Sequence, residues 1–195
     1  FITMNLSTSL AVKSKKVLAI DMDLRRASLS DYIHSPKCGI SDYLSGQVPD
    51  YSSIIVKGET IAGLDVIPVG TIPPNPTELL FSERFATLLE QLRMEYDYIF
   101  IDCPPSLGLL TINSLSAVDS VLIPIQCEFY ALEGVSQLVS TIELVKKSLN
   151  PNLEIQGVIL SMFDGRTNLS LQVVKREPTK IAAPQAASGL IYNGT

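Results

Sequence analysis

The stretch Tyr98–Pro105, with the sequence YIFIDCPP, decides the fold of this chain. Four apolar residues lead into Asp102, and the two prolines that follow Cys103 prevent regular structure from continuing. A short apolar run between such breakers is typical of a buried strand in a parallel sheet. The carboxyl end of such a strand is where open α/β sheets bind ligands, so Asp102 is a candidate Mg²⁺ residue. The alternative is a strand that simply ends in an aspartate.

A second apolar run has the same design. Val17–Ile20 is followed by Asp21 and Asp23, and then by Arg25 and Arg26. Two strands would therefore deliver carboxylates to one edge of a sheet, as phosphate chemistry with a divalent metal requires. The planar guanidinium groups of the two arginines suit phosphate oxygens. The alternative for this stretch is a solvated charge cluster at the end of a strand.

The apolar pattern alternates between strands and helices along the chain. It predicts strands at residues 17–20, 64–69, 98–101, 120–125 and 155–162, and helices at residues 4–11, 28–33, 40–44, 76–95, 107–117, 131–149 and 168–175. This alternation predicts an α/β fold, a doubly wound and mostly parallel sheet flanked by helices, with right-handed crossovers. We expect one nucleotide-binding domain over residues 1–176 and an irregular tail over residues 177–195.

Composition narrows the class of protein. The 195 residues are 46% apolar and 18% charged, which is typical of a globular chain. The net charge of −5 gives no global basic field, so any nucleic-acid contact must come from a local patch. His34 is the only histidine, which excludes a His-rich metal site. The three cysteines lack metal-ligand spacing and suit a reducing cytoplasm, and no apolar run is long enough to predict a membrane span.

Together these motifs resemble the Walker A′ and Walker B elements of the ParA/MinD group of deviant-Walker P-loop ATPases. That group also contains the bacterial tyrosine autokinases of capsule and exopolysaccharide assembly. Residues 1–96 are most similar to the kinase branch, with the loop Gly70–Leu80 (GTIPPNPTELL) as a marker. Residues 97–174 are similar to chromosome-partitioning ParA (Soj) proteins, through the stretches Asp102–Asn113, Pro124–Gly134 and Met162–Leu169. The change of pattern near the Walker B strand suggests a chimera.

The resemblance implies ATP and Mg²⁺ as ligands and a role for each matched residue. Asp23 would position the attacking water in a partition ATPase, or help to hold Mg²⁺ in a kinase, with Asp21 as its companion. Asp102 would hold Mg²⁺ through its water shell, and Arg25 and Arg26 would contact the nucleotide. Arg166 would bind DNA non-specifically, through a phosphate contact that salt weakens. The alternative for Arg166 is a solvated arginine in a turn.

One element of the family pattern is missing. The family holds the β and γ phosphates with a glycine-rich loop that ends in Gly-Lys-Thr, and this sequence contains no such loop. The resemblance aligns Phe1 with the residue just after that threonine, so we expect the loop upstream and a fold truncated at its N-terminus. We therefore expect negligible ATP hydrolysis by the chain as it stands.

Three functions follow from the resemblance. The preferred one is a partition ATPase of the bacterial cytoplasm: an ATP-dependent homodimer on the nucleoid that binds DNA non-specifically and is activated by a ParB-like partner. The second is the cytoplasmic domain of a tyrosine autokinase, paired with a membrane polysaccharide co-polymerase. The third is a catalytically inactive chimeric remnant.

Overall fold

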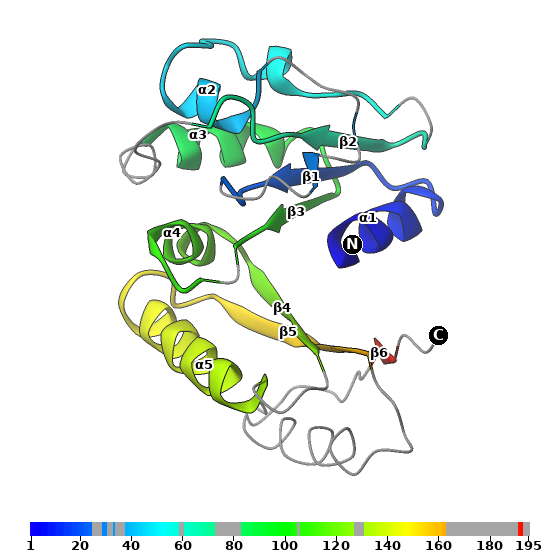
Figure 1. Ribbon diagram of the computed structural model, residues 1–195. Helices are drawn as coiled ribbons and strands as arrows, with labels where there is room; N and C mark the ends of the chain where they lie inside the picture. Colours follow the sequence, from blue (N-terminus) through cyan, green and yellow to red (C-terminus); the bar gives the residue numbers. More distant parts are fainter. Residues whose placement is uncertain are drawn as a thin grey trace. The chain divides into compact units, whose positions relative to one another are not determined.

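The computed structural model describes residues 1–24, 29–30, 33, 38–58, 61–72, 83–104, 106–126, 131–162 and 191–192. The chain divides into two compact units, Phe1–Ser114 and Leu115–Thr195 (Figure 1). Each unit is described by itself below.

The first unit contains a three-stranded parallel sheet with the order β2-β1-β3. Its strands are β1 (Val17–Asp21), β2 (Leu64–Ile67) and β3 (Tyr98–Asp102). Every residue of the central strand β1 is buried, as expected for an apolar strand that is covered on both faces. The three predicted strands are confirmed, although β2 ends at Ile67 instead of Val69.

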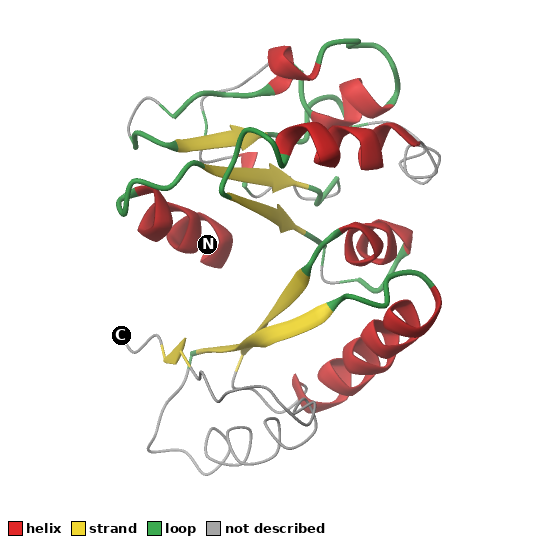
Figure 2. Cartoon of the chain, turned by 180° about the vertical axis from the view of Figure 1, so that it is seen from behind, coloured by secondary structure: helices red, strands yellow, loops and turns green. Residues whose placement is uncertain are grey.

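Helices lie on both faces of this sheet. Figures 1 and 2 show α1 (Ile2–Ala11) on one face and α3 (Glu83–Leu92) on the other. On the α1 face, Ala11 packs with Val17 and Leu64 in a buried cluster. The short helix α2 (Ile40–Leu44) has the predicted bounds, and a 3₁₀ turn, η2 (Tyr51–Ile54), follows it. The helix α4 (Leu109–Ala117) spans the boundary between the units.

The second unit contains another parallel sheet, with the order β4-β5-β6. It consists of β4 (Ser120–Gln126), the long helix α5 (Ala131–Ser148), β5 (Glu154–Ser161) and the two-residue strand β6 (Ile191–Tyr192). Asn150 closes the turn after α5, because its side-chain amide donates to the carbonyls of Leu115 (3.0 Å) and Val118 (2.8 Å). Strand β6 pairs with Ile159 and Leu160, so part of the segment expected as an irregular tail joins the sheet.

The predicted α/β fold with mostly parallel sheets is confirmed. All strand ladders in the described residues are parallel, and the antiparallel bridge between Val56 and Val66 stands outside them. The expected helix at 168–175 and half of that at 28–33 lie outside the described residues. Within the described ranges, no helix has both the length and the apolar character that crossing a membrane requires.

Candidate functional site

The carboxyl edge of the first sheet gathers three aspartates. Asp21 and Asp102 are register partners at the ends of β1 and β3, and the backbone N–H of Met22 donates to the carbonyl of Asp102 at 2.9 Å. Asp23 follows two residues after Asp21 and is 7% exposed, while Asp21 is fully buried. The structure therefore brings together at one edge the aspartates that the sequence singled out.

Asp102 lies in a negatively charged and partly buried environment. Burial raises the pKa of its carboxyl group, and the nearby charges of Asp21 and Asp23 raise it further. A hydrogen bond of 3.0 Å from the Thr3 hydroxyl of α1 opposes this shift of the Asp102 pKa. In the described part of the chain, no lysine or arginine forms an ion pair with Asp102. The positive charge of the N-terminal amino group lowers the Asp102 pKa, but among the described residues the net shift remains upward.

Asp21 is occupied by hydrogen bonds to the protein. One of its carboxylate oxygens accepts from the backbone N–H of Asp23 at 3.1 Å. The other accepts from the backbone N–H of Ser30 at 2.9 Å and from the Ser30 hydroxyl at 2.8 Å. Since the side chain is also fully buried, Asp21 braces the turn after β1.

Cys103 follows Asp102 directly but is a poor nucleophile. Burial raises the pKa of its thiol to about 11, and the charges of Asp102 and Asp23 contribute to the rise. The thiolate is the reactive form of cysteine, so at neutral pH the Cys103 side chain is unreactive. The groups available for chemistry at this edge of the sheet are therefore the carboxylates.

The donor set fits Mg²⁺ in part. Carboxylate oxygens are the ligands that Mg²⁺ prefers, and in phosphate sites the ion keeps several waters and takes one or two carboxylates. Within the described ranges, no three side chains of the metal-binding types gather closely enough to hold an ion by themselves. Asp102 and Asp23 would therefore hold Mg²⁺ together with water and the phosphates of a ligand.

The other predicted site residues lie outside the described residues. These are Arg25, Arg26 and Arg166, and their roles stay predictions. Conversely, the structure adds two residues that sequence reasoning missed, Thr3 and Ser30, whose hydroxyl groups contact the aspartates. No local pattern could have found Thr3, because 99 positions separate it from Asp102.

Comparisons with protein families and known proteins identify the relatives of this chain. A family model described as an AAA domain matches residues 2–155. The sporulation initiation inhibitor protein Soj of Bacillus subtilis is 43% identical over 184 residues, covering 89% of this chain and 71% of that protein. The chromosome partitioning protein ParA of Myxococcus xanthus is 42% identical over 184 residues, covering 88% of this chain and 62% of that protein. The similarity to partition proteins therefore extends well beyond residues 97–174.

Solved structures with the same fold come from several branches. Cobyrinic acid a,c-diamide synthase of Mycobacterium smegmatis, with bound ATP analog and magnesium, superimposes with a TM-score of 0.77 at 28% identity, covering 89% of this chain and 75% of that chain. The kinase domain of the Escherichia coli tyrosine kinase ETK superimposes with a TM-score of 0.71 at 28% identity, covering 86% of this chain and 65% of that chain. The predicted P-loop NTPase type of fold and the predicted resemblance to both branches are thus confirmed. The chain belongs to the AAA domain family and, within it, to the Soj/ParA group of ATPases.

Proposed function

We propose that this chain is the nucleotide-handling part of a ParA-type ATPase of chromosome or plasmid partitioning. The observation that carries the proposal is the meeting of Asp21, Asp23 and Asp102 at the carboxyl edge of β1 and β3. An excess of carboxylates at this edge of a parallel sheet suits the binding of Mg²⁺ and a nucleotide phosphate. The relatives named Soj and ParA, and the synthase crystallised with an ATP analog and magnesium, support the same ligand class.

Each aspartate has a distinct task in this proposal. Asp102 holds a water of the Mg²⁺ shell, and Thr3 keeps its carboxylate oriented. Asp23 orients the attacking water, while Asp21 holds the backbone of Asp23 in place. The metal, when bound, neutralises charge on the transferred phosphoryl group. Arg25 and Arg26 add positive charge on the nucleotide side.

The chain by itself is expected to hydrolyse ATP negligibly, because no stretch of it supplies the Gly-Lys-Thr loop. The test joins such a loop ahead of Phe1 and measures Mg²⁺-dependent phosphate release. We expect hydrolysis to appear and to fall by about a hundredfold or more in Asp23→Asn. Glu90→Gln, which neutralises an exposed carboxylate of α3, is the matched control and should keep full activity. Equal activity in Asp23→Asn and Glu90→Gln would refute the assignment.

DNA binding is the second part of the proposal. An ATP-dependent homodimer is expected to bind DNA non-specifically through Arg166 and to be activated by a ParB-like partner. Retention on DNA cellulose should drop in Arg166→Ala and with added salt, whereas Lys147→Ala, a matched loss of one positive charge in the same unit, should change it little. If the Arg166→Ala variant is retained on DNA cellulose as strongly as the unaltered protein, the DNA-binding part of the proposal is refuted. In this function the protein would act in the bacterial cytoplasm, on the nucleoid.

A tyrosine autokinase domain is the second candidate function, favoured by the superposition on the ETK kinase domain. This function would require a membrane polysaccharide co-polymerase as partner. Mass spectrometry of the loop-joined protein after incubation with Mg²⁺ and ATP separates the two functions. Phosphotyrosine without DNA retention would favour the kinase, and DNA retention without phosphotyrosine would favour the partition ATPase. The absence of both would favour an inactive remnant.

A further inference from the structure

The hydroxyl group of Ser30 connects two segments at the carboxyl edge of the first sheet. It donates to the carboxylate of Asp21 at 2.8 Å and accepts from the backbone N–H of Val69 at 3.0 Å. The backbone N–H of Ser30 donates to the same Asp21 oxygen at 2.9 Å. Because the hydroxyl donates on one side and accepts on the other, its orientation is fixed by both neighbours.

On one side, this connection leads to Asp23. The second oxygen of Asp21 accepts from the backbone N–H of Asp23 at 3.1 Å, and the Asp21 side chain has no exposure to solvent. Of the hydrogen bonds that described residues donate to the Asp21 carboxylate, two come from Ser30 and one from Asp23. A change in the orientation of the Asp21 carboxylate would therefore change the position of the Asp23 backbone.

On the other side, the connection leads to the segment Pro68–Thr71 after β2. Helix α2 holds this segment independently of Ser30. The Ser41 hydroxyl lies 2.7 Å from the carbonyl oxygen of Val69 and 2.6 Å from that of Thr71, and Asp42 accepts from the backbone N–H of Thr71 at 3.1 Å. In the sequence, Gly70 and Thr71 open the loop Gly70–Leu80, the proline-rich motif that the proposed function leaves without a role.

We infer that Ser30 is a positioning residue that sets Asp23 through Asp21 and couples it to the Pro68–Thr71 segment. Binding of a Mg²⁺-bound nucleotide phosphate at Asp23 and Asp102 would then stabilise the Pro68–Thr71 segment. Conversely, a change in the conformation of that segment would alter binding at the aspartates. This reciprocity is thermodynamic linkage. The inference rests on the proposed function for its ligand, but the positioning role of Ser30 can be measured without any ligand.

The first experiment measures backbone amide hydrogen exchange by NMR in the full chain without ligand. Ser30→Ala should speed exchange by roughly tenfold at Val69 and several-fold at Asp23, relative to amides in the centre of β1. Ser30→Thr keeps the hydroxyl and should restore both rates. Ser41→Ala is the matched control, because it removes a serine hydroxyl from the α2 side of the same segment and should leave Asp23 unchanged.

Two outcomes would overturn the positioning role. One is an Asp23 exchange rate in Ser30→Ala equal to that of the unaltered chain. The other is an equal acceleration at Asp23 in Ser41→Ala, which would show general loosening. If Ser30→Ala does not fold, Ser30→Cys makes the same test, since a thiol fills the place of the hydroxyl and is only a weak donor.

The second experiment adds Mg²⁺ and ADP to the loop-joined protein and distinguishes failure of this inference from failure of the proposed function. Slower exchange at Val69 in the loop-joined protein, lost in its Ser30→Ala variant and regained in its Ser30→Thr variant, would support the coupling. Protection at Asp23 and Asp102 with none at Val69 would overturn the coupling and keep the proposed function. No protection anywhere would contradict the proposed function, and the ligand-free comparison would then decide the role of Ser30 alone.

Discussion

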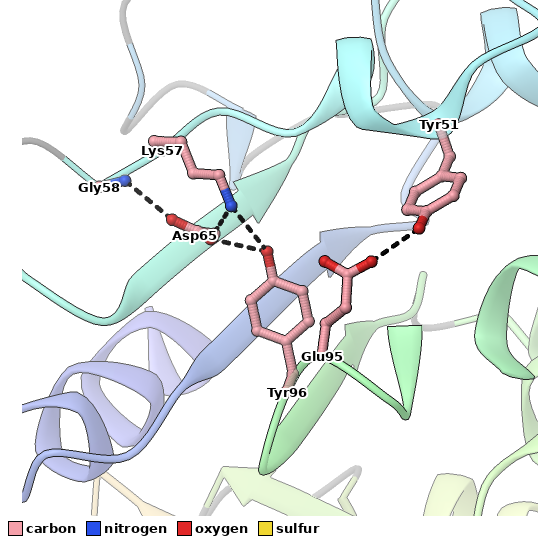
Figure 3. A network of polar contacts seen from close by, with 6 residues as sticks. All are labelled: Tyr51, Lys57, Gly58, Asp65, Glu95 and Tyr96. Carbon is pink, nitrogen blue, oxygen red and sulfur yellow. Dashed lines mark hydrogen bonds and ion pairs between the residues drawn. The ribbon is translucent and has the colours of Figure 1, made fainter. Parts of the chain in front are cut away.

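The two edges of the first sheet shift the pKa of a partly buried carboxylate in opposite directions. At the carboxyl edge, Asp102 lies beside Asp21 and Asp23, and its pKa is raised by burial and by their charges. At the amino edge, Asp65 of β2 is surrounded by donors (Figure 3). Burial alone would raise the pKa of Asp65, but hydrogen bonds from Lys57, Tyr96 and Gly58 lower it. Among the described residues, the pKa of the carboxylate is therefore raised at one edge and lowered at the other.

The network of Lys57, Asp65 and Tyr96 at the amino edge stabilises the fold. Lys57 forms an ion pair of 2.8 Å with Asp65, and the Tyr96 hydroxyl donates to the same oxygen at 2.6 Å. The network thereby ties the segment before β2 to the connection before β3, close to the bridge between Val56 and Val66. Among the described residues, hydrogen bonds lower the pKa of the carboxylate at the amino edge, whereas the pKa of Asp102 at the carboxyl edge stays raised. Carboxylates with a shifted pKa are more common at functional sites.

The largest effect on stability is expected from Gly39→Ala, at the carboxyl edge. A Cβ on Gly39 would overlap the backbone of Pro68 and Gly70, which cannot move away while α2 holds the segment. We expect a loss of more than about 2 kcal/mol in the free energy of unfolding, measured by urea denaturation. Gly134→Ala is the matched control: nothing lies within 4 Å of its added Cβ in α5. This second change should stabilise the helix by about 0.5–1 kcal/mol, and equal losses in both variants would contradict the close approach.

At the amino edge, Asp65→Asn should be more harmful than Lys57→Met. Neutralising Asp65 weakens the hydrogen bonds of two donors at once, so we expect a loss of about 1–3 kcal/mol. The Lys57 side chain is 71% exposed, so its replacement should cost about 0–1 kcal/mol. Urea denaturation of both variants measures the difference. The reverse order would show that the ion pair, and not the carboxylate with its hydrogen bonds, dominates this edge.

The amino edge also predicts how stability depends on pH. The lowered pKa of Asp65 adds stability above its unfolded value of about 4, and this stability is lost as the pH falls through the folded pKa. Burial and the Asp65 hydrogen bond raise the pKa of Tyr96 to about 12, so its contribution is complete below about pH 10 and is lost as the pH rises toward 12. Unfolding midpoints across the pH range should show a shallower acid limb in Asp65→Asn and a shallower alkaline limb in Tyr96→Phe. Unchanged limbs in both variants would contradict the network.

The smallest effect is expected from Tyr51→Phe. The Tyr51 hydroxyl donates to Glu95 at 2.6 Å, next to the Asp65 network, and raises its own pKa in doing so. The pair is exposed, where water replaces a lost hydrogen bond, so thermal unfolding should show no measurable change. A clear drop in the unfolding temperature would mean that Tyr51 and Glu95 belong to the same cooperative network as Asp65.

The sequence allowed the first sheet and its carboxylate edge to be predicted, because that information is local. Apolar runs that end in aspartate predicted β1 and β3 to within one residue, and parallel pairing then places Asp21 beside Asp102. Strand β2 ends earlier than predicted because Pro68 has no N–H and the N–H of Val69 bonds to Ser30 instead of a neighbouring strand. The contacts of Thr3, Ser30 and Tyr96 could not be predicted, since each depends on which segments the fold brings together.

The most direct test of the central claim compares the two edges with a paramagnetic probe. Mn²⁺ replaces Mg²⁺ in the presence of ADP, and the broadening of backbone amide signals is recorded by NMR in the loop-joined protein. We predict strong broadening around Asp23 and Asp102, little around Asp65, and a marked reduction at the carboxyl edge in Asp102→Asn. Equal broadening at both edges, or broadening at the carboxyl edge that Asp102→Asn leaves unchanged, would contradict the claim that these aspartates bind a metal-bound nucleotide.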